Sequence, residues 1–436
     1  MRPDRPPLET LKDGTFRQIH PVTGEEVWNV PGRAWRPKRS HRAAPPSRLE
    51  TVPGPEGFCD FCESRRLETP PEKSRWWLDD QGKWRTAAFL AAGEIPRGPA
   101  DFRRIANLFE IVTYDYWAKN LGFKPAKDRL AWRDTYLADP AGRAHVEGLI
   151  RSKARLGGRE PVLNSEGRLA DLALQAEPLF FGSHELIVEG AHFRPRAEWD
   201  HEVVSSGDLD PSRHRKYIAY TADSARDILA ANPKAQYVAV FQNWMAGAGA
   251  SFEHLHKQLV GLDRPGPYVE RMLQALKGDP ALFNRRILAP ALERDWVVAS
   301  NRHAVAVAAF GTQLPSVWVF SLSQKTRPWE LTPDELDGVS DLLHACHAAM
   351  GPEVASNEEW VFTPPGEKAR VPFHVTLKWR TGIHAGFEGA TKIFINPLRP
   401  DELRDRLMER LEGLAPLGRL GDVTIGGKVS KDPLPE

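Results

Sequence analysis

Three polar side chains occupy alternate positions in the stretch GASFEHLHKQLVG, from Gly249 to Gly261. Alternate residues of a β-strand share one face, so His254, His256 and Gln258 are expected to point the same way. Two imidazoles and an amide on one buried face cost free energy unless each has a partner. A neutral imidazole held by a hydrogen bond at one ring nitrogen can act as a nucleophile through the other. The pattern therefore indicates a binding or catalytic site.

A pair of cysteines, Cys59 and Cys62 in GFCDFCES, is the second candidate for chemistry. A C-x-x-C pair fits a redox site or half a zinc site, and a redox pair is expected near a βαβ pattern. This pair follows the coil PPSRLETVPGPEG, which favours half a zinc site that needs two more ligands. The third cysteine, Cys346 in HACH, is interpreted as a buried apolar residue. A chain of 436 residues with three cysteines has no disulfide framework.

Composition excludes several classes of protein. Lys and Arg number 59 and Asp and Glu 58, so the net charge of +1 gives no general attraction to nucleic acid or anionic membranes. The sequence shows neither the apolar core of a signal peptide nor a run that would span a bilayer. We expect a cytoplasmic protein without nucleic-acid or membrane partners, whose 41% apolar residues form a packed core.

The expected elements repeat along the chain. The order strand, strand, helix, strand, loop, strand occurs once before residue 262 and once after it, which predicts an α+β fold with halves at 1–262 and 263–436. Two strands are expected across 179–193, and a helical insertion over about 113–165. The first copy carries His254 and His256 where the second carries only His374. This difference predicts that one half kept the chemistry.

Six segments resemble, in the same order, the galactose-1-phosphate uridylyltransferase family of the histidine-triad superfamily. FQNWMAGAGASFEHLHKQ resembles its active-site segment, with an F-x-N strand end, a small-residue loop, a serine and His-x-His-x-Gln. The other five segments are HPVTGEEVWNVPGRAWRP, CDFC, IANLFE, HELIVEGAHF and HVTLKWRTGIHAGFEGATKIFINPLRPDELRDRL. The last is similar to the branch that includes ADP-glucose phosphorylases. The resemblance covers most of the chain except the helical insertion.

The resemblance implies two tandem histidine-triad-like halves, each an antiparallel sheet with packed helices. It implies ping-pong transfer of a nucleoside monophosphate between a nucleotide sugar and a sugar 1-phosphate or phosphate, with His256 as the nucleophile. Implied roles are catalytic for His256, Gln258 and Ser251, nucleotide- or phosphate-binding for Arg33, Arg36, Asn107, Asn243 and Gly249, and sugar- or acceptor-binding for Phe387 and Glu388. Cys59, Cys62, His192 and His254 would hold a structural zinc ion. A homodimer is also implied.

Two departures from the family pattern affect these expectations. Pro372 stands where a second metal site would need a histidine, so no second metal is predicted. Leu255 replaces a proline between the two histidines, which allows a different specificity. The alternatives are a phosphorylase or hydrolase of nucleotide sugars or dinucleoside polyphosphates, and a nucleotide-binding protein without turnover. The base, the sugar and the acceptor stay open.

Overall fold

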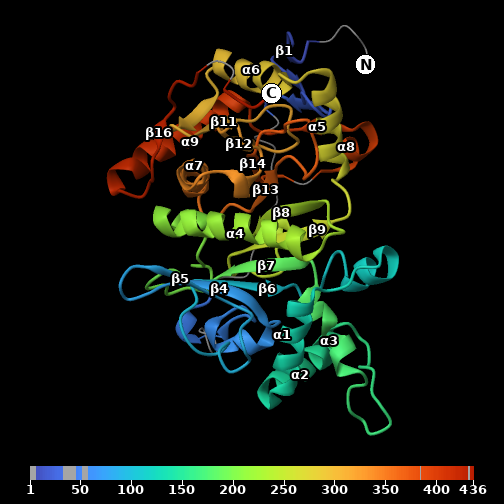
Figure 1. Ribbon diagram of the computed structural model, residues 1–436. Coiled ribbons are helices and arrows are strands. Elements are labelled where there is room, and N and C mark those ends of the chain that lie inside the picture. The colour runs from blue at the N-terminus through green and yellow to red at the C-terminus, as the bar shows by residue number, and fades with distance from the viewer. Residues whose placement is uncertain (1–5, 33–45, 52–56, 383, 431–432) are drawn as a thin grey trace.

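The computed structural model describes residues 6–32, 46–51, 57–382, 384–430 and 433–436 (Figure 1). Its main feature is a twelve-stranded antiparallel sheet with the strand order β16-β10-β11-β12-β14-β13-β8-β9-β7-β6-β4-β5. Six neighbouring strands at one end of this order come from the first part of the chain: β4 (Glu72–Leu78), β5 (Trp84–Ala88), β6 (Phe102–Ala106), β7 (His184–Glu189), β8 (Tyr237–Trp244) and β9 (His256–Leu262). The six neighbouring strands at the other end come from the later part of the chain: β10 (Val297–Ser300), β11 (Ala304–Ala308), β12 (Ser316–Ser321), β13 (Ser356–Val361), β14 (His374–Trp379) and β16 (Thr424–Ile425).

The order strand, strand, helix, strand, strand occurs twice in the structure, with β6 in place of the additional strand that was predicted within 179–193. The first half runs β6, β7, α4, β8, β9 and the second runs β11, β12, α7, β13, β14. The two copies meet at β8 and β13, which pair antiparallel with Asn243 opposite Asn357 and Gln242 opposite Glu358. The sheet therefore continues without a break from one half into the other. The division of the chain at residue 262 stays a prediction.

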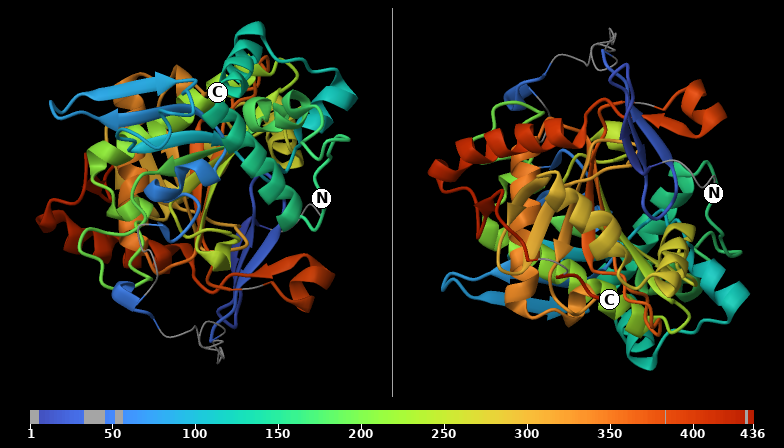
Figure 2. Two further views of the ribbon diagram at one scale, coloured as in Figure 1. Left: turned by 90° about the horizontal axis from the view of Figure 1, so that it is seen from below. Right: turned by 90° about the horizontal axis from the view of Figure 1, so that it is seen from above.

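Helices α4 (Pro211–Ala231) and α7 (Pro333–Met350) pack against each other and against strands of the central sheet (Figures 1 and 2). Both helices have a side-chain cap at the N-terminus. The Asp210 side chain accepts from the Arg213 amide before α4, and Thr332 forms a capping box with Glu335 at the start of α7. They cover one face of the central strands, so the residues on the other face are left for the site.

The helical insertion is larger than predicted. It contains α1 (Lys127–Ala138), α2 (Pro140–Leu156) and α3 (Leu172–Phe181) between β6 and β7. These helices supply most of a hydrophobic cluster that also includes Leu90, Ala92, Ile95 and Ala235. Figure 1 shows these helices projecting from the end of the molecule that contains β4 and β5. The prediction of two strands across 179–193 was wrong, because α3 extends to Phe181 and only β7 follows. Short apolar runs do not distinguish a strand from a buried helix.

A second sheet combines β1 (Leu8–Thr10), β2 (Phe16–Ile19) and β3 (Glu26–Asn29) with β15 (Ile393–Ile395), which runs parallel to β3. It contacts the turn between β11 and β12, where the Gly311 amide donates to Gln18 Oε1 at 2.9 Å. The remaining α-helices are α5 (Pro267–Gly278), α6 (Ala289–Glu293), α8 (Gly386–Thr391) and α9 (Pro400–Leu414). Among the described residues, none of the helices is long and apolar enough to cross a bilayer.

Candidate active site

His256 begins β9 with its imidazole held in one orientation. Nδ1 donates to the backbone oxygen of His254 at 2.7 Å, so Nε2 carries the lone pair of a neutral ring. Burial, which leaves 5% of the residue exposed, lowers the pKa of His256 to about 4. The ring is therefore neutral near pH 7, and its unprotonated nitrogen has the electronic form that a nucleophile needs.

Gln258 shares this face of β9, and its amide is oriented by a histidine to which the sequence analysis gave no role. The Ile111 amide donates to His184 Nδ1 at 3.0 Å, so the proton of the neutral ring lies on Nε2. That nitrogen lies 3.1 Å from Gln258 Oε1 and donates to it. Asn107 Nδ2 lies 3.1 Å from the same nitrogen. With its oxygen engaged, Gln258 keeps its NH₂ group to donate to a ligand.

Asn243 is oriented in a comparable way by a residue of the second half. Asn357 Nδ2 donates to Asn243 Oδ1 at 2.7 Å and to the Ala248 oxygen at 3.0 Å. Phe241 pairs with Gln258, so Asn243 lies level with His256 on the neighbouring strand. The oxygen of Asn243 is occupied, and its NH₂ group remains as a donor. Two amide donors thus flank His256, an arrangement suited to an anion.

The small-residue loop between β8 and β9 has an open side at Gly249. Its φ of +87° lies in the left-handed region, and a Cβ built there would meet no atom within 4 Å. The amides of Ala248, Gly249 and Ala250 all donate to oxygens of the same loop. These three amides are thus engaged within the loop and are not free to donate to the nucleotide or phosphate that Gly249 was predicted to bind. Ser251 follows with an exposed side chain.

The four predicted metal ligands come together. The ligand atoms of Cys59, Cys62, His192 and His254 all lie within 4.8 Å of one another. The Sγ–Sγ distance is 3.8 Å, and Cys59 Sγ lies 3.5 Å from Nδ1 of both histidines. A tetrahedral zinc ion with Zn–S of about 2.3 Å and Zn–N of about 2.0–2.1 Å has edges of about 3.8 and 3.5 Å. The residues therefore fit a tetrahedral metal ion.

His254 connects this cluster to the nucleophile candidate. Its Nε2 donates to the Glu189 oxygen at 2.7 Å, which leaves Nδ1 as the ligand atom. Its backbone oxygen is the group that holds His256. The hydrogen bond from Cys59 lowers the pKa of Cys62 and raises that of Cys59, and metal binding would displace the remaining thiol proton. A bound metal would thus fix the residue that orients His256.

The opposite face of β9 is anchored by a buried charge network. Lys257 Nζ lies 2.6 Å from Glu358 Oε1 and 3.0 Å from Gln242 Oε1. Glu358 also accepts from His347 Nε2 at 2.9 Å and from Trp360 Nε1 at 2.6 Å. Because Lys257 belongs to the first half and Glu358 to the second, the pair ties the strand of His256 to the other half.

A family profile described as "Domain of unknown function (DUF4921)" matches residues 11–433. The chain belongs to the DUF4921 family. This DUF4921 chain is homologous to an ADP-glucose phosphorylase of Arabidopsis thaliana, with 24% identity over an alignment of 238 residues that covers 52% of this chain. The matched part covers 65% of that relative, less than two thirds of its length.

Two solved structures share the fold of the DUF4921 chain. One is an ADP-glucose phosphorylase from Arabidopsis thaliana with bound ADP-glucose, which matches with a TM-score of 0.56 and 19% identity. The other is a GalT-like protein from the same plant, with a TM-score of 0.55 and 18% identity. Each alignment covers 90% of this chain and 97% of the other. The α+β fold with large antiparallel sheets and packed helices is thereby confirmed.

The remaining predicted residues of the DUF4921 chain are Phe387, Glu388, Arg33 and Arg36. Phe387 and Glu388 lie on α8 beside the small sheet, where Glu388 accepts from the Ala385 amide and Phe387 faces Trp28. Among the described residues, their recorded side-chain contacts do not reach His256. Arg33 and Arg36 lie outside the described residues.

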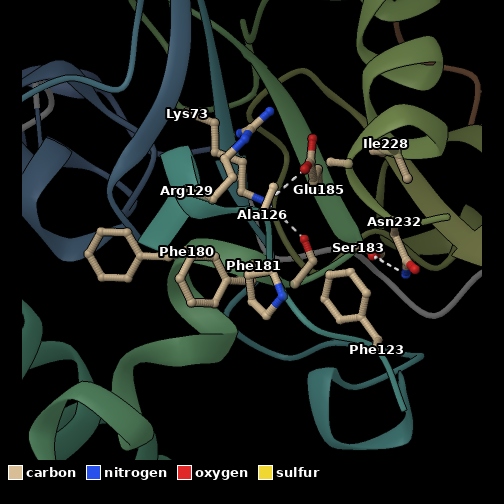
Figure 3. A pocket seen from close by; sticks show the side chains of 13 residues that line it. Lys73, Phe123, Ala126, Arg129, Phe180, Phe181, Ser183, Glu185, Ile228 and Asn232 are labelled. Carbon is tan, nitrogen blue, oxygen red and sulfur yellow. Dashed lines mark hydrogen bonds and ion pairs between the residues drawn. The ribbon is translucent and has the colours of Figure 1, made fainter. Parts of the chain in front are cut away.

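A cavity beside β7 is separate from the site (Figure 3). It holds about 20 Å³, and its lining includes Lys73, Arg129 and Glu185. Glu185 alternates with His184 along β7 and therefore faces the other side of the sheet. The volume is suited to a single water molecule rather than a nucleotide.

Proposed function

We propose that the protein is a nucleotidyltransferase that passes a nucleoside monophosphate from a nucleotide sugar to a phosphate or sugar 1-phosphate through a covalent nucleotidyl-His256. The observation that carries this proposal is the neutral His256 ring flanked by the free NH₂ groups of Gln258 and Asn243. Similarity to an ADP-glucose phosphorylase supports phosphate as an acceptor and a nucleotide sugar as a donor.

The first step is attack of the Nε2 lone pair of His256 on the α-phosphorus. The bond from phosphorus to the bridging oxygen breaks, and its electron pair leaves with the sugar 1-phosphate. In the second step an oxygen of the acceptor attacks the same phosphorus, and the P–N electron pair returns to Nε2. Gln258 and Asn243 would donate to the non-bridging oxygens as charge develops.

The metal in this proposal is a structural zinc ion held by Cys59, Cys62, His192 and His254. When bound, zinc would supply rigidity to the peptide that orients His256, without contact to the substrate. We expect one zinc per chain by elemental analysis, and none in a Cys59→Ser/Cys62→Ser variant. A metal content unchanged by that double substitution would contradict the assignment.

The deciding experiment is the intact mass of the protein after incubation with a panel of nucleotide sugars. Wild-type protein is expected to gain the mass of one nucleoside monophosphate as an acid-labile adduct. His256→Ala should gain nothing, whereas His374→Ala, which changes the corresponding histidine of the second half, should still form the adduct. Absence of an adduct with every donor, in folded protein that holds its zinc, would overturn the proposed function.

A further inference from the structure

Arg380 lies directly after β14 on the same face of the sheet as His256. Its Nε donates to Asn357 Oδ1, while its two terminal nitrogens make no hydrogen bond or ion pair that the structure records among the described residues. The side chain is exposed. A guanidinium with its inner nitrogen fixed and its outer two free has the geometry for two parallel hydrogen bonds to a phosphate.

The sheet register places Asn357, which holds this guanidinium, two strands away from the nucleophile in the same row. Asn357 on β13 is directly opposite Asn243 on β8, and Asn243 lies level with His256 on β9. Neighbouring strands lie about 4.8 Å apart, so the backbone of Asn357 is about 10 Å from that of His256. Arg380 reaches back over Asn357 toward this row. The span suits a phosphate attached to, or attacking, a phosphorus at His256.

Asn357 positions other residues of the site and has no polar group left to bind a substrate. The residue is 4% exposed. Its NH₂ group donates to Asn243 Oδ1 and to the Ala248 oxygen, and its Oδ1 accepts from Arg380 Nε. It therefore sets three parts of the site from the second half: a flanking amide, the small-residue loop and the guanidinium.

A neighbouring cation on this face has its charge compensated. Lys378 on β14 pairs with Glu359 Oε2 at 2.6 Å, so its ammonium is already matched by a carboxylate. Both side chains of that pair are partly exposed, and such pairs contribute little to binding or stability. Arg380 is different because its contact is with a neutral amide, which leaves the positive charge for an incoming anion.

We propose that Arg380, positioned by Asn357, binds the phosphate of the group exchanged at the phosphorus: the sugar 1-phosphate that leaves and the phosphate or sugar 1-phosphate that attacks. This inference rests on the proposed function. Gln258 and Asn243 are neutral donors to the phosphoryl group, and Arg380 supplies a positive charge for the second phosphate. The second half, although it lacks the nucleophile, thereby provides the acceptor subsite.

The test uses the isolated nucleotidyl-enzyme and compares its discharge by inorganic phosphate with its discharge by water. Water carries no charge, so its reaction reports the intact phosphorus site alone. Arg380→Met is expected to raise the phosphate concentration needed for half-maximal discharge by about 10–100-fold, the usual effect of a lost charge-assisted hydrogen bond. Discharge by water should stay within about twofold. Guanidinium ion added to Arg380→Ala should restore part of the discharge by phosphate.

Three further variants separate a subsite from general effects. Arg406→Met on α9 removes an exposed arginine elsewhere, and Lys378→Met removes a charge from the same face; both should behave like wild type. Asn357→Ala should impair discharge by phosphate and by water, because it releases Asn243 as well as Arg380. Equal losses in Lys378→Met and Arg380→Met, or an unchanged phosphate dependence in Arg380→Met, would overturn the inference. Failure of wild-type protein to form any adduct would instead overturn the proposed function.

Discussion

His256 in the first half and His374 in the second occupy equivalent places and share the same local geometry. Each begins the strand that follows the repeat's loop. The His256 Nδ1 donates to the oxygen two residues earlier at 2.7 Å, and the His374 Nδ1 does the same to Pro372 at 2.8 Å. Burial lowers the pKa of each to about 4. A correctly oriented, neutral imidazole is therefore present twice.

The two histidines differ in what surrounds them. The strand register puts Thr376 in the place of Gln258, Val361 in that of Asn243 and Ser316 in that of His184. The ring of His374 instead contacts Phe320 at 4.8 Å and Phe283 at 5.7 Å between centroids, and the residue is 2% exposed. The side chains in these places lack the amide donors that an anion needs. The comparison teaches that the donors around the ring, rather than the ring's orientation, distinguish the two places.

The largest expected effect comes from replacing each of the two histidines by glutamine in a variant of its own. His256→Gln should lower the rate of nucleotidyl transfer by about 10³-fold or more, because the attacking lone pair is lost. His374→Gln should stay within about threefold of wild type. Steady-state rates with the donor identified by mass measurement would show this, and a comparable loss in both variants would remove the distinction between the halves.

The ion pair that joins the halves should matter chiefly for stability. Lys257→Met leaves Glu358 buried without its lysine, and we expect the free energy of unfolding to fall by about 3–5 kcal/mol. Chemical denaturation of the variant would measure the loss. Lys257→Met combined with Glu358→Gln removes both charges and should recover part of it. A loss below about 1 kcal/mol in the single variant would show that the pair does not hold the halves together.

Removing one flanking donor tests directly whether the amide donors around His256 make it reactive. Gln258→Ala should lower the rate of adduct formation by about 10²–10³-fold, as the loss of one oxyanion donor does elsewhere. Thr376→Gln, which places an amide beside His374, should create no second adduct, because the aromatic contacts remain. Intact mass against time would follow both variants. A second adduct in Thr376→Gln would mean that a single amide is enough to make the second place reactive.

The smallest expected effect is on the acid dependence of stability. The folded-state pKa of His374 is about 4, below the ordinary 6.5, so the unfolded chain binds a proton between these values and the folded chain does not. Its contribution is complete above pH 6.5 and is lost as the pH falls toward 4. His374→Asn should therefore reduce the decline in the free energy of unfolding between pH 6.5 and 4.5 by about 1–3 kcal/mol. An unchanged decline would show that this ring accepts a proton in the folded protein.

The parts of the site that were predictable lie close together in the sequence or form a motif. The sequence shows directly that His254, His256 and Gln258 alternate, and the C-x-x-C pair indicates part of a metal site. His256 and Gln258 do share a strand face. His254 lies just before the strand and turns into the cysteine cluster. Local spacing was sufficient for the shared strand face of His256 and Gln258. The metal cluster instead joins Cys59 to histidines 133 and 195 positions away, and it was predicted from the family resemblance.

Asn357 could not be found in that way, and Arg380 lay within a recognised segment, HVTLKWRTGIHAGFEGATKIFINPLRPDELRDRL, without a predicted role. They reach the site only because β13 pairs with β8, and sequence periodicity says nothing about which strands become neighbours. His184 lay within a recognised segment, HELIVEGAHF, but its importance depends on the amide of Ile111, which fixes its tautomer. The third insertion helix was missed because Leu179, Phe180 and Phe181 suit a strand as well as a buried helix.

The unbroken pairing of β8 with β13 has a consequence for any fragment of this chain. A piece that ended near residue 262 would keep the nucleophile and the metal ligands, yet it would lose the strand that covers β8. Residues 241–244, the part of β8 that pairs with β13, would then form a bare edge whose backbone amides and carbonyls are free to recruit another chain. Such a fragment would be prone to aggregate or swap strands, and we therefore expect the two copies of the repeat to fold as one unit.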